Sequence, residues 1–276
     1  MKIAQIVAWG LAEAAFAAWG AVTPPPAGTP TAQEIVARSV ANNNADWDAA
    51  PHYNYTSSEV VTKHGVATSK TYDVLMIGGA PYNKLIKVNG EPLSPQQAAR
   101  EEQKLQKETA LRRQSAHRQS EVAEYLRERS QDHELMTEMV RAFNYKLMGE
   151  ETVNGRRCYV LKATPRPGYR PPNRDTKVLT GMRGTMWVDT QDYQWVKVKA
   201  EVFRPVAFGL FIAQVQPGTE FELEESPVSG NLWMPSRFLT RVNAKILYLF
   251  PYQTSDLVTY WNYRPAGEVQ QAVRTK

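Results

Sequence analysis

Residues 181–203 limit what this chain can fold into more than any other segment. On either side of its polar middle, the even positions 186, 188, 196, 198, 200 and 202 are apolar, and most of the odd positions between them are polar or charged. A period of two is typical of a β-strand that turns one face toward an apolar core and the other toward water. The polar run 190–192 predicts a turn, so the segment is expected to form two strands of a one-sided sheet. Trp187 and Trp195 interrupt the pattern on the expected polar face.

The same alternation recurs along much of the chain and predicts a mainly β (α+β) fold. Further strands are expected at residues 53–61, 72–76, 82–88, 145–153, 156–163, 220–224, 237–248 and 257–263. The apolar run 206–215 is too short to span a bilayer. It is interpreted as a buried strand or as an apolar lip at a cavity mouth, and the buried strand is the favoured prediction. Residues 31–265 are expected to form one domain.

Two helical regions interrupt the strands. Thr31 predicts the N-cap of a short helix over 32–42, which the asparagine run 42–44 should end. A helical insert is expected near 94–143. Its charged first part, 94–129, is interpreted as a solvated helix over the rim of the sheet or as an arm that binds a partner. The second part, from Asp132, has an apolar stripe that indicates either core packing or a movable plug over a cavity.

The N-terminal segment resembles a secretory signal peptide. A single lysine precedes an Ala-rich apolar run, and small residues allow cleavage after Ala17 or Gly20. Glu13 disfavours a permanent membrane anchor. Residues 1–20 are therefore predicted to be a signal peptide for export to the periplasm, 21–30 a Pro-rich linker and 266–276 a polar tail. No cysteine lies near the cleavage region, so no lipobox is expected.

The charge pattern argues against nucleic-acid binding. The 276 residues carry a formal net charge of +5, from 33 basic and 28 acidic groups that are interspersed, whereas nucleic-acid-binding proteins gather basic groups on one face. The loop 164–174 is rich in proline and arginine. It is interpreted as a soluble crossover or as a contact with an anionic surface through Arg166, Arg170 and Arg174.

No pattern for catalysis, metal binding or cofactor binding is present. There is no G-x-S-x-G motif, the four histidines lack a zinc-ligand spacing, and the single cysteine, Cys158, lies inside a predicted strand. Asp189 and Asp192 flank a turn, where aspartate commonly serves local hydrogen bonding. The chain is therefore predicted not to be an enzyme, with no catalytic residue, metal or cofactor.

The order of predicted elements, the W-V-D-x-x-D arrangement within 184–196, and the segments PGTEFELE and LWMPSRF carry a resemblance to a known family. Over most of residues 31–263 the chain resembles the periplasmic lipoprotein-carrier superfamily (LolA/LolB-like). The resemblance implies an incomplete antiparallel β-barrel with helices packed in or over its open side. It also implies an apolar cavity for acyl chains and no catalysis.

Together these observations favour an exported, non-enzymatic binder or carrier of a lipid or a lipidated protein, with transient contact to a membrane or an envelope protein. The alternative is a cell-envelope protein-interaction or stress-sensor module on the same fold. The sequence leaves the oligomeric state open. The residues expected to line the cavity are Met186, Val188, Val196, Val198, Val202, Phe221, Leu223, Phe238, Val242, Ile246, Leu135, Met136, Met139 and Phe143.

Overall fold

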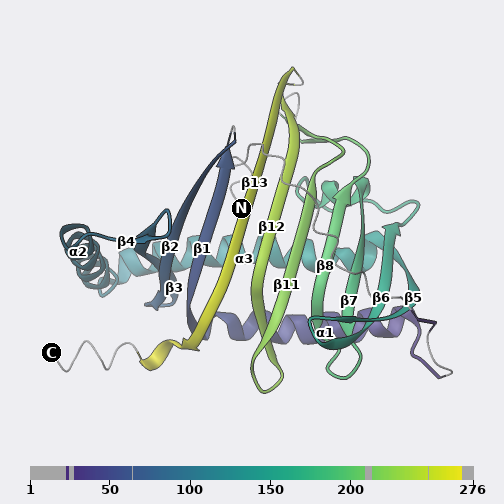
Figure 1. Ribbon diagram of the computed structural model, residues 1–276, viewed down its shortest axis with the longest axis horizontal. Helices are drawn as coiled ribbons and strands as arrows, with labels where there is room; N and C mark the ends of the chain where they lie inside the picture. Colours follow the sequence, from purple (N-terminus) through teal and green to yellow (C-terminus); the bar gives the residue numbers. More distant parts are fainter. Residues whose placement is uncertain (1–22, 25–27, 64, 209–212, 248, 269–276) are drawn as a thin grey trace.

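The computed structural model of the chain describes residues 23–24, 28–63, 65–208, 213–247 and 249–268. Within these residues, 13 strands form one antiparallel sheet that does not close into a barrel. Helices α1 (Ala32–Ala49) and α3 (Ser115–Ala142) cross one face of this sheet (Figure 1). The predicted architecture, an incomplete antiparallel barrel with helices over its open side, is confirmed.

The sheet brings its first and last long strands side by side, because β1 pairs with β13. Each predicted strand overlaps an observed one. The spatial order is β4 (Glu91–Pro92), β3 (Ala80–Val88), β2 (Val66–Ile77), β1 (Tyr53–Lys63), β13 (Phe250–Pro265), β12 (Leu232–Ile246), β11 (Glu220–Ser229), β8 (Trp195–Val202), β7 (Met182–Asp189), β6 (Arg156–Pro165) and β5 (Phe143–Val153).

The apolar run 206–215 differs from its prediction. It forms two short strands, β9 (Val206–Phe208) and β10 (Ala213–Val215), which pair with each other, and β10 also pairs with the end of β12. The prediction of one continuous buried strand is therefore wrong. The chain folds back because Ala213 pairs with both Phe208 and Ile246, an arrangement that local hydrophobicity does not reveal.

Helix α1 begins as predicted but runs further. Thr31 and Glu34 form a capping box, in which each side chain satisfies the other residue's backbone N–H. The asparagine run 42–44 does not end the helix, because tertiary contacts use its side chains. Asn42 donates to the Asp192 carbonyl oxygen at 2.6 Å, and Asn44 Oδ1 lies 2.9 Å from a ring nitrogen of His133.

The insert divides at a different place from the one predicted. Helix α2 (Pro95–Leu111) starts with a capping box at Ser94 and ends before residues 112–114, whereas α3 runs without a break through 130–132. The Arg112 side chain is buried at this corner and donates to the carbonyl oxygens of Ile77, Ala80 and Pro81. The remaining short helices are η1 (Ala50–His52), η2 (Thr176–Gly181) and η3 (Ala266–Glu268).

The strand register gives the sheet two different faces. On the helix-covered face, apolar residues follow one another from β6 to β12, namely Leu161, Met186, Val198, Leu223 and Phe238. The other face is charged. Glu222 lies 3.1 Å from Lys197 and 3.0 Å from Lys199, and it also pairs with Arg237. Burial opposes its ionisation, but these cations hold the pKa of Glu222 at about 2.

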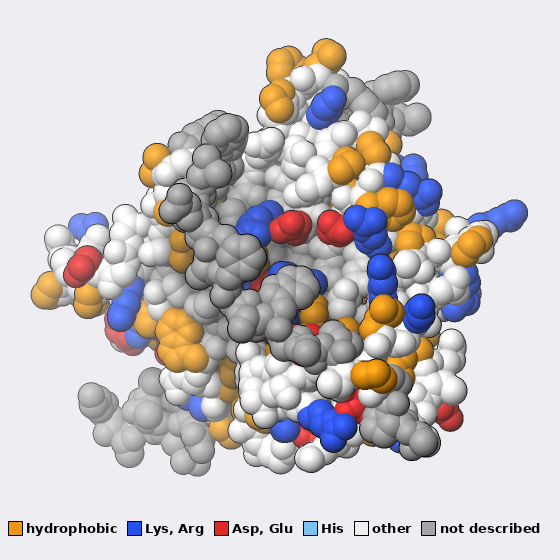
Figure 2. All heavy atoms as spheres, turned by 45° about the vertical axis from the view of Figure 1, so that its right-hand side comes forward, with side chains coloured by type: hydrophobic (Ala, Val, Ile, Leu, Met, Phe, Trp, Pro, Cys, Tyr) orange, Lys and Arg blue, Asp and Glu red, His pale blue; other side chains and the backbone are white. Residues whose placement is uncertain are grey.

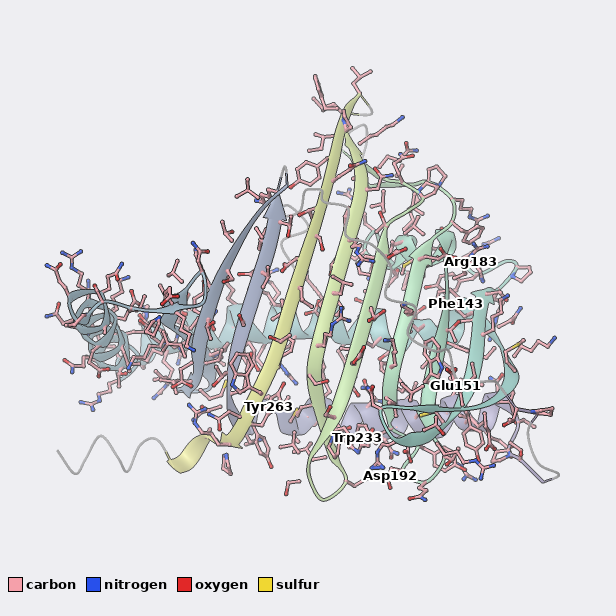
Figure 3. The ribbon with its side chains drawn as sticks, viewed as in Figure 1. Phe143, Glu151, Arg183, Asp192, Trp233 and Tyr263 are labelled. Carbon is pink, nitrogen blue, oxygen red and sulfur yellow. The ribbon has the colours of Figure 1, made fainter. Side chains whose placement is uncertain are left out.

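The strand directions also define two ends of the sheet. Asp192 and Trp233 lie near the lower end in Figure 3, whereas Arg183 and Phe143 lie nearer the upper end.

The predicted signal peptide lies outside the described residues. In the predicted linker, the backbone of Thr23 exchanges two hydrogen bonds with that of Glu150, at 2.9 and 2.8 Å.

Candidate binding face

The helices close part of the helix-covered face into a core. Met186 and Val188 are buried there with Ile35 and Val36 of α1, and Met136 and Met139 of α3 pack on the same cluster. A second cluster buries Phe143 and Val202, which were predicted to line the cavity, together with Met182. Leu135, another predicted lining residue, packs against this cluster. The apolar stripe of α3 therefore packs as core at this point.

One predicted lining residue lies on the opposite face. The register of β7 and β8 shifts between Trp187 and Val188, so Val188 pairs with Trp195 instead of Val196. The assignment of Val196 to the helix-covered face is therefore wrong, since Val196 is buried with Cys158 and Trp233 in a separate cluster. The assignment of Trp195 to the polar face is also wrong.

Trp195 instead fixes α1 to the sheet. Its side chain is buried among the residues of the first cluster, and its indole N–H donates to Ser39 Oγ at 3.1 Å. Trp187 remains on the other face, where its indole N–H donates to Glu151 Oε2 at 2.8 Å.

The middle of the helix-covered face is apolar but less covered. Residues of β11, β12 and β13 line up there by register, and all of them are only half-buried: Phe221, Leu223, Phe238, Val242 and Val258. We call this set the central strip. Phe238, Val242 and Val258 do not belong to the buried core clusters of the described residues. Val198 adjoins Leu223, and Ile246 lies beyond the strip at the exposed end of β12.

Helix α3 crosses this strip as a strap. Its principal contacts with the sheet are with β3 near one edge and with β5 near the other, where it also contacts η2. In the middle of α3, Arg129 stacks on the ring of Trp47 of α1, 4.3 Å from the ring centroid. The two ends of α3 are therefore anchored on opposite sides of the central strip.

A buried polar group lies at the lower end of the same face. Asp46 of α1 and Glu225 of β11 are both buried, and Glu225 faces Asn43 across a distance of 3.5 Å. Burial raises the pKa of Asp46 to about 6. Burial and the nearby charge of Asp46 raise the pKa of Glu225 to about 8. The sequence analysis missed this pair, although the consecutive Glu224 and Glu225 break the alternation and were a usable signal.

Cys158 is fully buried, and burial followed by the charge of Asp189 raises the pKa of its thiol to about 12, which disfavours the reactive thiolate. In this part of the chain, no cluster of three or more His, Cys, Asp and Glu side chains is arranged to hold a metal ion. None of the described helices has the length and apolarity needed to cross a membrane.

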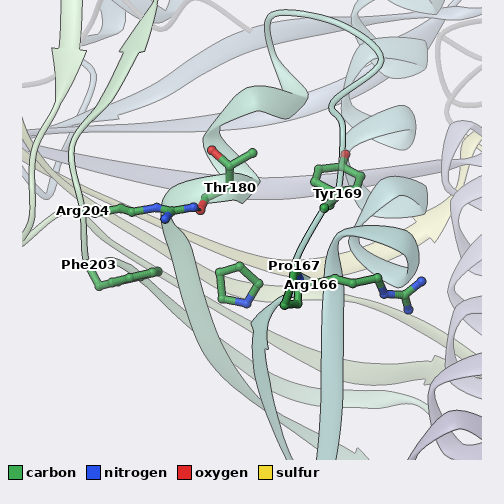
Figure 4. Close-up of a pocket in the computed structure, with 8 residues that line it drawn as sticks. Arg166, Pro167, Tyr169, Thr180, Phe203 and Arg204 are labelled. Atoms are coloured by element: carbon green, nitrogen blue, oxygen red, sulfur yellow. Dashed lines mark hydrogen bonds between the residues drawn. The ribbon is translucent and has the colours of Figure 1, made fainter.

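The Pro/Arg loop forms a surface pocket of about 410 Å³ at the upper end of the sheet. Figure 4 shows Arg166, Tyr169, Phe203 and Arg204 around it. Arg166 has a structural role here, because its guanidinium donates to the carbonyl oxygen of Phe143, 3.3 Å away at the end of α3. Arg170 and Arg174 are exposed.

No protein-family model matches this chain, and no curated protein matches it. Three solved structures align with it at low identity. A DUF1329 family protein from Desulfovibrio piger is 11% identical with a TM-score of 0.35, covering 86% of this chain and 94% of that one. LolA superfamily protein NE2245 from Nitrosomonas europaea is 13% identical with a TM-score of 0.32 and the same coverages, 86% and 94%.

The third is an outer membrane lipoprotein-sorting protein domain from Vibrio parahaemolyticus. It is 8% identical with a TM-score of 0.34, covering 83% of this chain and 93% of that one.

Proposed function

We propose that this protein is an exported, non-enzymatic binder or carrier of acyl chains, which belong to a lipid or to a lipidated protein. The observation that carries the proposal is the central strip, a row of half-buried apolar residues on the helix-covered face. A folded protein gains stability by covering such a surface, and an apolar ligand can supply that cover.

The position of α3 supports this proposal. A helix anchored at both sides of the strip can hold an extended ligand against the sheet. Met136 and Met139 lie at one end of this strap, and methionine side chains adapt to variable shapes.

The chemistry of the strip suits an alkyl chain. Its residues present aliphatic and aromatic groups, which bind an alkyl chain without the need for hydrogen bonds. Each buried methylene contributes about 0.8 kcal/mol, so a chain of several methylenes would be retained without any polar anchor.

The experiment that tests the proposal is native mass spectrometry of protein purified without detergent from an exporting cell. We expect co-purified lipid or acylated peptide, and we expect Val242→Asp to abolish it. Val60→Asp is the matched control, because Val60 is also a half-buried valine but lies on the opposite face, where it pairs with Leu257. Protein that is consistently empty, or equal loss in both variants, would contradict the proposal.

The alternative is a protein-interaction module of the cell envelope. Helix α2 favours it, because most of its surface is exposed and charged while the buried Arg112 fixes its end to the sheet. A stoichiometric protein partner that survives Val242→Asp, but is lost when residues 94–130 are deleted, would support this function over lipid carriage.

A further inference from the structure

The hairpin between β12 and β13 has an apolar tip exposed to solvent. Its exposed residues are Ile246, Leu247, Leu249 and Phe250; Leu249 is 77% exposed and Phe250 is 61% exposed. The hairpin extends beyond the neighbouring strands at the upper end of the sheet (Figure 1). Figure 2 shows hydrophobic side chains gathered at the top of the molecule with a basic side chain beside them.

The segments around this tip are basic. The strand register brings parts of three segments to the upper end of the sheet: residues 60–70, 202–219 and 239–255. None of these segments contains an aspartate or a glutamate. Their cationic residues are Lys63, Lys70, Arg204 and Lys245, together with Arg241, which pairs with Glu220 at 2.9 Å. Val66 in the β1–β2 turn and Phe203 after β8 add exposed apolar side chains at this end.

We propose that this end of the sheet docks on an anionic phospholipid bilayer, with the β12–β13 tip inserted among the lipids. Exposed aliphatic and aromatic side chains flanked by lysine and arginine match the two forces that hold peripheral proteins on membranes, apolar burial and attraction to anionic headgroups. A protein partner fits less well, because a stable interface needs about 800 Å² on each side and a projecting hairpin tip offers little area.

The exposed Arg170 and Arg174 of the Pro/Arg loop lie on the connection from β6 to η2, which also leaves the upper end of the sheet. They would add cations to the same docking surface. The inference goes beyond the proposed function, because the tip lies outside the central strip and its effect is measured on membranes and not on cargo.

The direct test places an environment-sensitive label on the tip. Because Cys158 is fully buried, Leu249→Cys provides the accessible thiol for a nitrobenzoxadiazole label. Vesicles of phosphatidylglycerol and phosphatidylcholine should shift the label's emission to shorter wavelength. The same label at Leu126→Cys, which is exposed on α3, should not shift. Absence of a shift at Leu249→Cys would overturn the proposal.

A flotation assay with the same vesicles measures the contribution of the tip. We expect the double variant L249S/F250S to bind at least about tenfold more weakly, since two large apolar side chains no longer enter the bilayer. The double variant L126S/M148S removes two exposed apolar side chains elsewhere and should bind like the unsubstituted chain. All proteins are recovered from the same exporting cell, so their N-termini are identical.

Two further outcomes would count against membrane docking. Equal binding to pure phosphatidylcholine vesicles would remove the role of the cations. Self-association that L249S/F250S abolishes, without vesicle binding, would assign the tip to a second copy of the chain. If circular dichroism shows that L249S/F250S does not fold, the emission shift of the label at Leu249→Cys decides whether the tip enters the bilayer. Retained cargo in a folded L249S/F250S variant would separate this inference from the carrier function.

Discussion

Asp46 of α1 accepts a hydrogen bond through Oδ1 from the backbone N–H of Trp233 on β12, at 3.1 Å. This contact joins a helix near the start of the described chain to a strand 187 residues later. The other carboxyl oxygen of Asp46 and Oε2 of the neighbouring Glu225 are buried, and neither has a hydrogen-bond partner among the described residues. The attachment of α1 to the sheet therefore depends on carboxyl groups that the fold holds away from water.

These carboxyls predict that stability falls as the pH rises. Both pKa values are raised in the folded state, Asp46 to about 6 and Glu225 to about 8, so the folded protein binds more protons than the unfolded chain. Their contribution is complete below about pH 4 and is lost as the pH rises through about 6 and then about 8.

Glu225→Gln should flatten this dependence, because a neutral amide is not penalised for burial. The variant should be more stable than the unsubstituted chain at about pH 8.5, by an amount on the order of 2 kcal/mol. Urea unfolding between about pH 5 and pH 8.5 measures this. The exposed Glu91 provides the control Glu91→Gln, and an unchanged pH slope for Glu225→Gln would disprove the role of Glu225.

Gly184 is predicted to tolerate no side chain. A Cβ at this position of β7 would collide with the carbonyl oxygen of Lys199 on the neighbouring strand and come within 3.3 Å of the Ala200 Cα. Gly184→Ala should lower the free energy of unfolding by about 1 to 3 kcal/mol, since the obstacle is backbone that cannot rotate away. Gly267→Ala, with no atom within 4 Å of the added Cβ, should change stability little. Equal effects in urea unfolding would argue against the close strand approach.

Arg112 is predicted to be irreplaceable by lysine. Its guanidinium reaches three carbonyl oxygens of the β2–β3 turn and pairs with Glu108 at 2.6 Å. A single ammonium cannot reproduce this fork of donors, so Arg112→Lys should destabilise the protein by about 2 to 4 kcal/mol. Hydrogen exchange should quicken at the corner between α2 and α3. The exposed neighbour substitution Arg113→Lys should leave exchange unchanged.

Asp256 is predicted to oppose the binding of acyl chains at alkaline pH. It lies on the helix-covered face, two residues from Val258 of the central strip, and its buried Oδ1 has no hydrogen-bond partner within the part of the chain that the structure describes. Burial, followed by the charge of Glu59, raises its pKa to about 6. A fluorescent fatty acid should therefore bind more weakly above about pH 6 than below it.

Asp256→Asn should remove most of that pH dependence and strengthen binding at about pH 8. The control is Asp175→Asn, since Asp175 is exposed in the loop before η2 and is not part of the central strip. Binding that is equally pH-dependent in Asp256→Asn would show that another group controls it.

The local parts of the fold were predictable because each is written in a short stretch of chain. The capping boxes at Thr31 and Ser94 and the alternation along β7 and β8 are interactions between residues a few positions apart. The same reasoning failed at Val196, since a one-residue shift in strand pairing exchanged its face with that of Trp195. A bulge of this kind depends on the partner strand and leaves no unambiguous local pattern.

The candidate site was predictable in part. Alternation identified Phe221, Leu223, Phe238 and Val242 as residues of one apolar face, and the register places them together. It did not distinguish these half-buried residues from Met186 and Val188, which the helices close into the core. That difference depends on where α1 and α3 cross the sheet.

By itself, the sequence determined that this chain forms strands with one apolar face and helices that cap in defined places, because side-chain periodicity and capping act over a few residues. Only the tertiary structure decided that β1 pairs with β13, that the asparagines of α1 bond to distant elements, and that Asp46 and Glu225 share a buried site. These features arise from contacts between residues far apart in the chain. Their energies depend on packing and burial, which exist only once the sheet and helices are assembled.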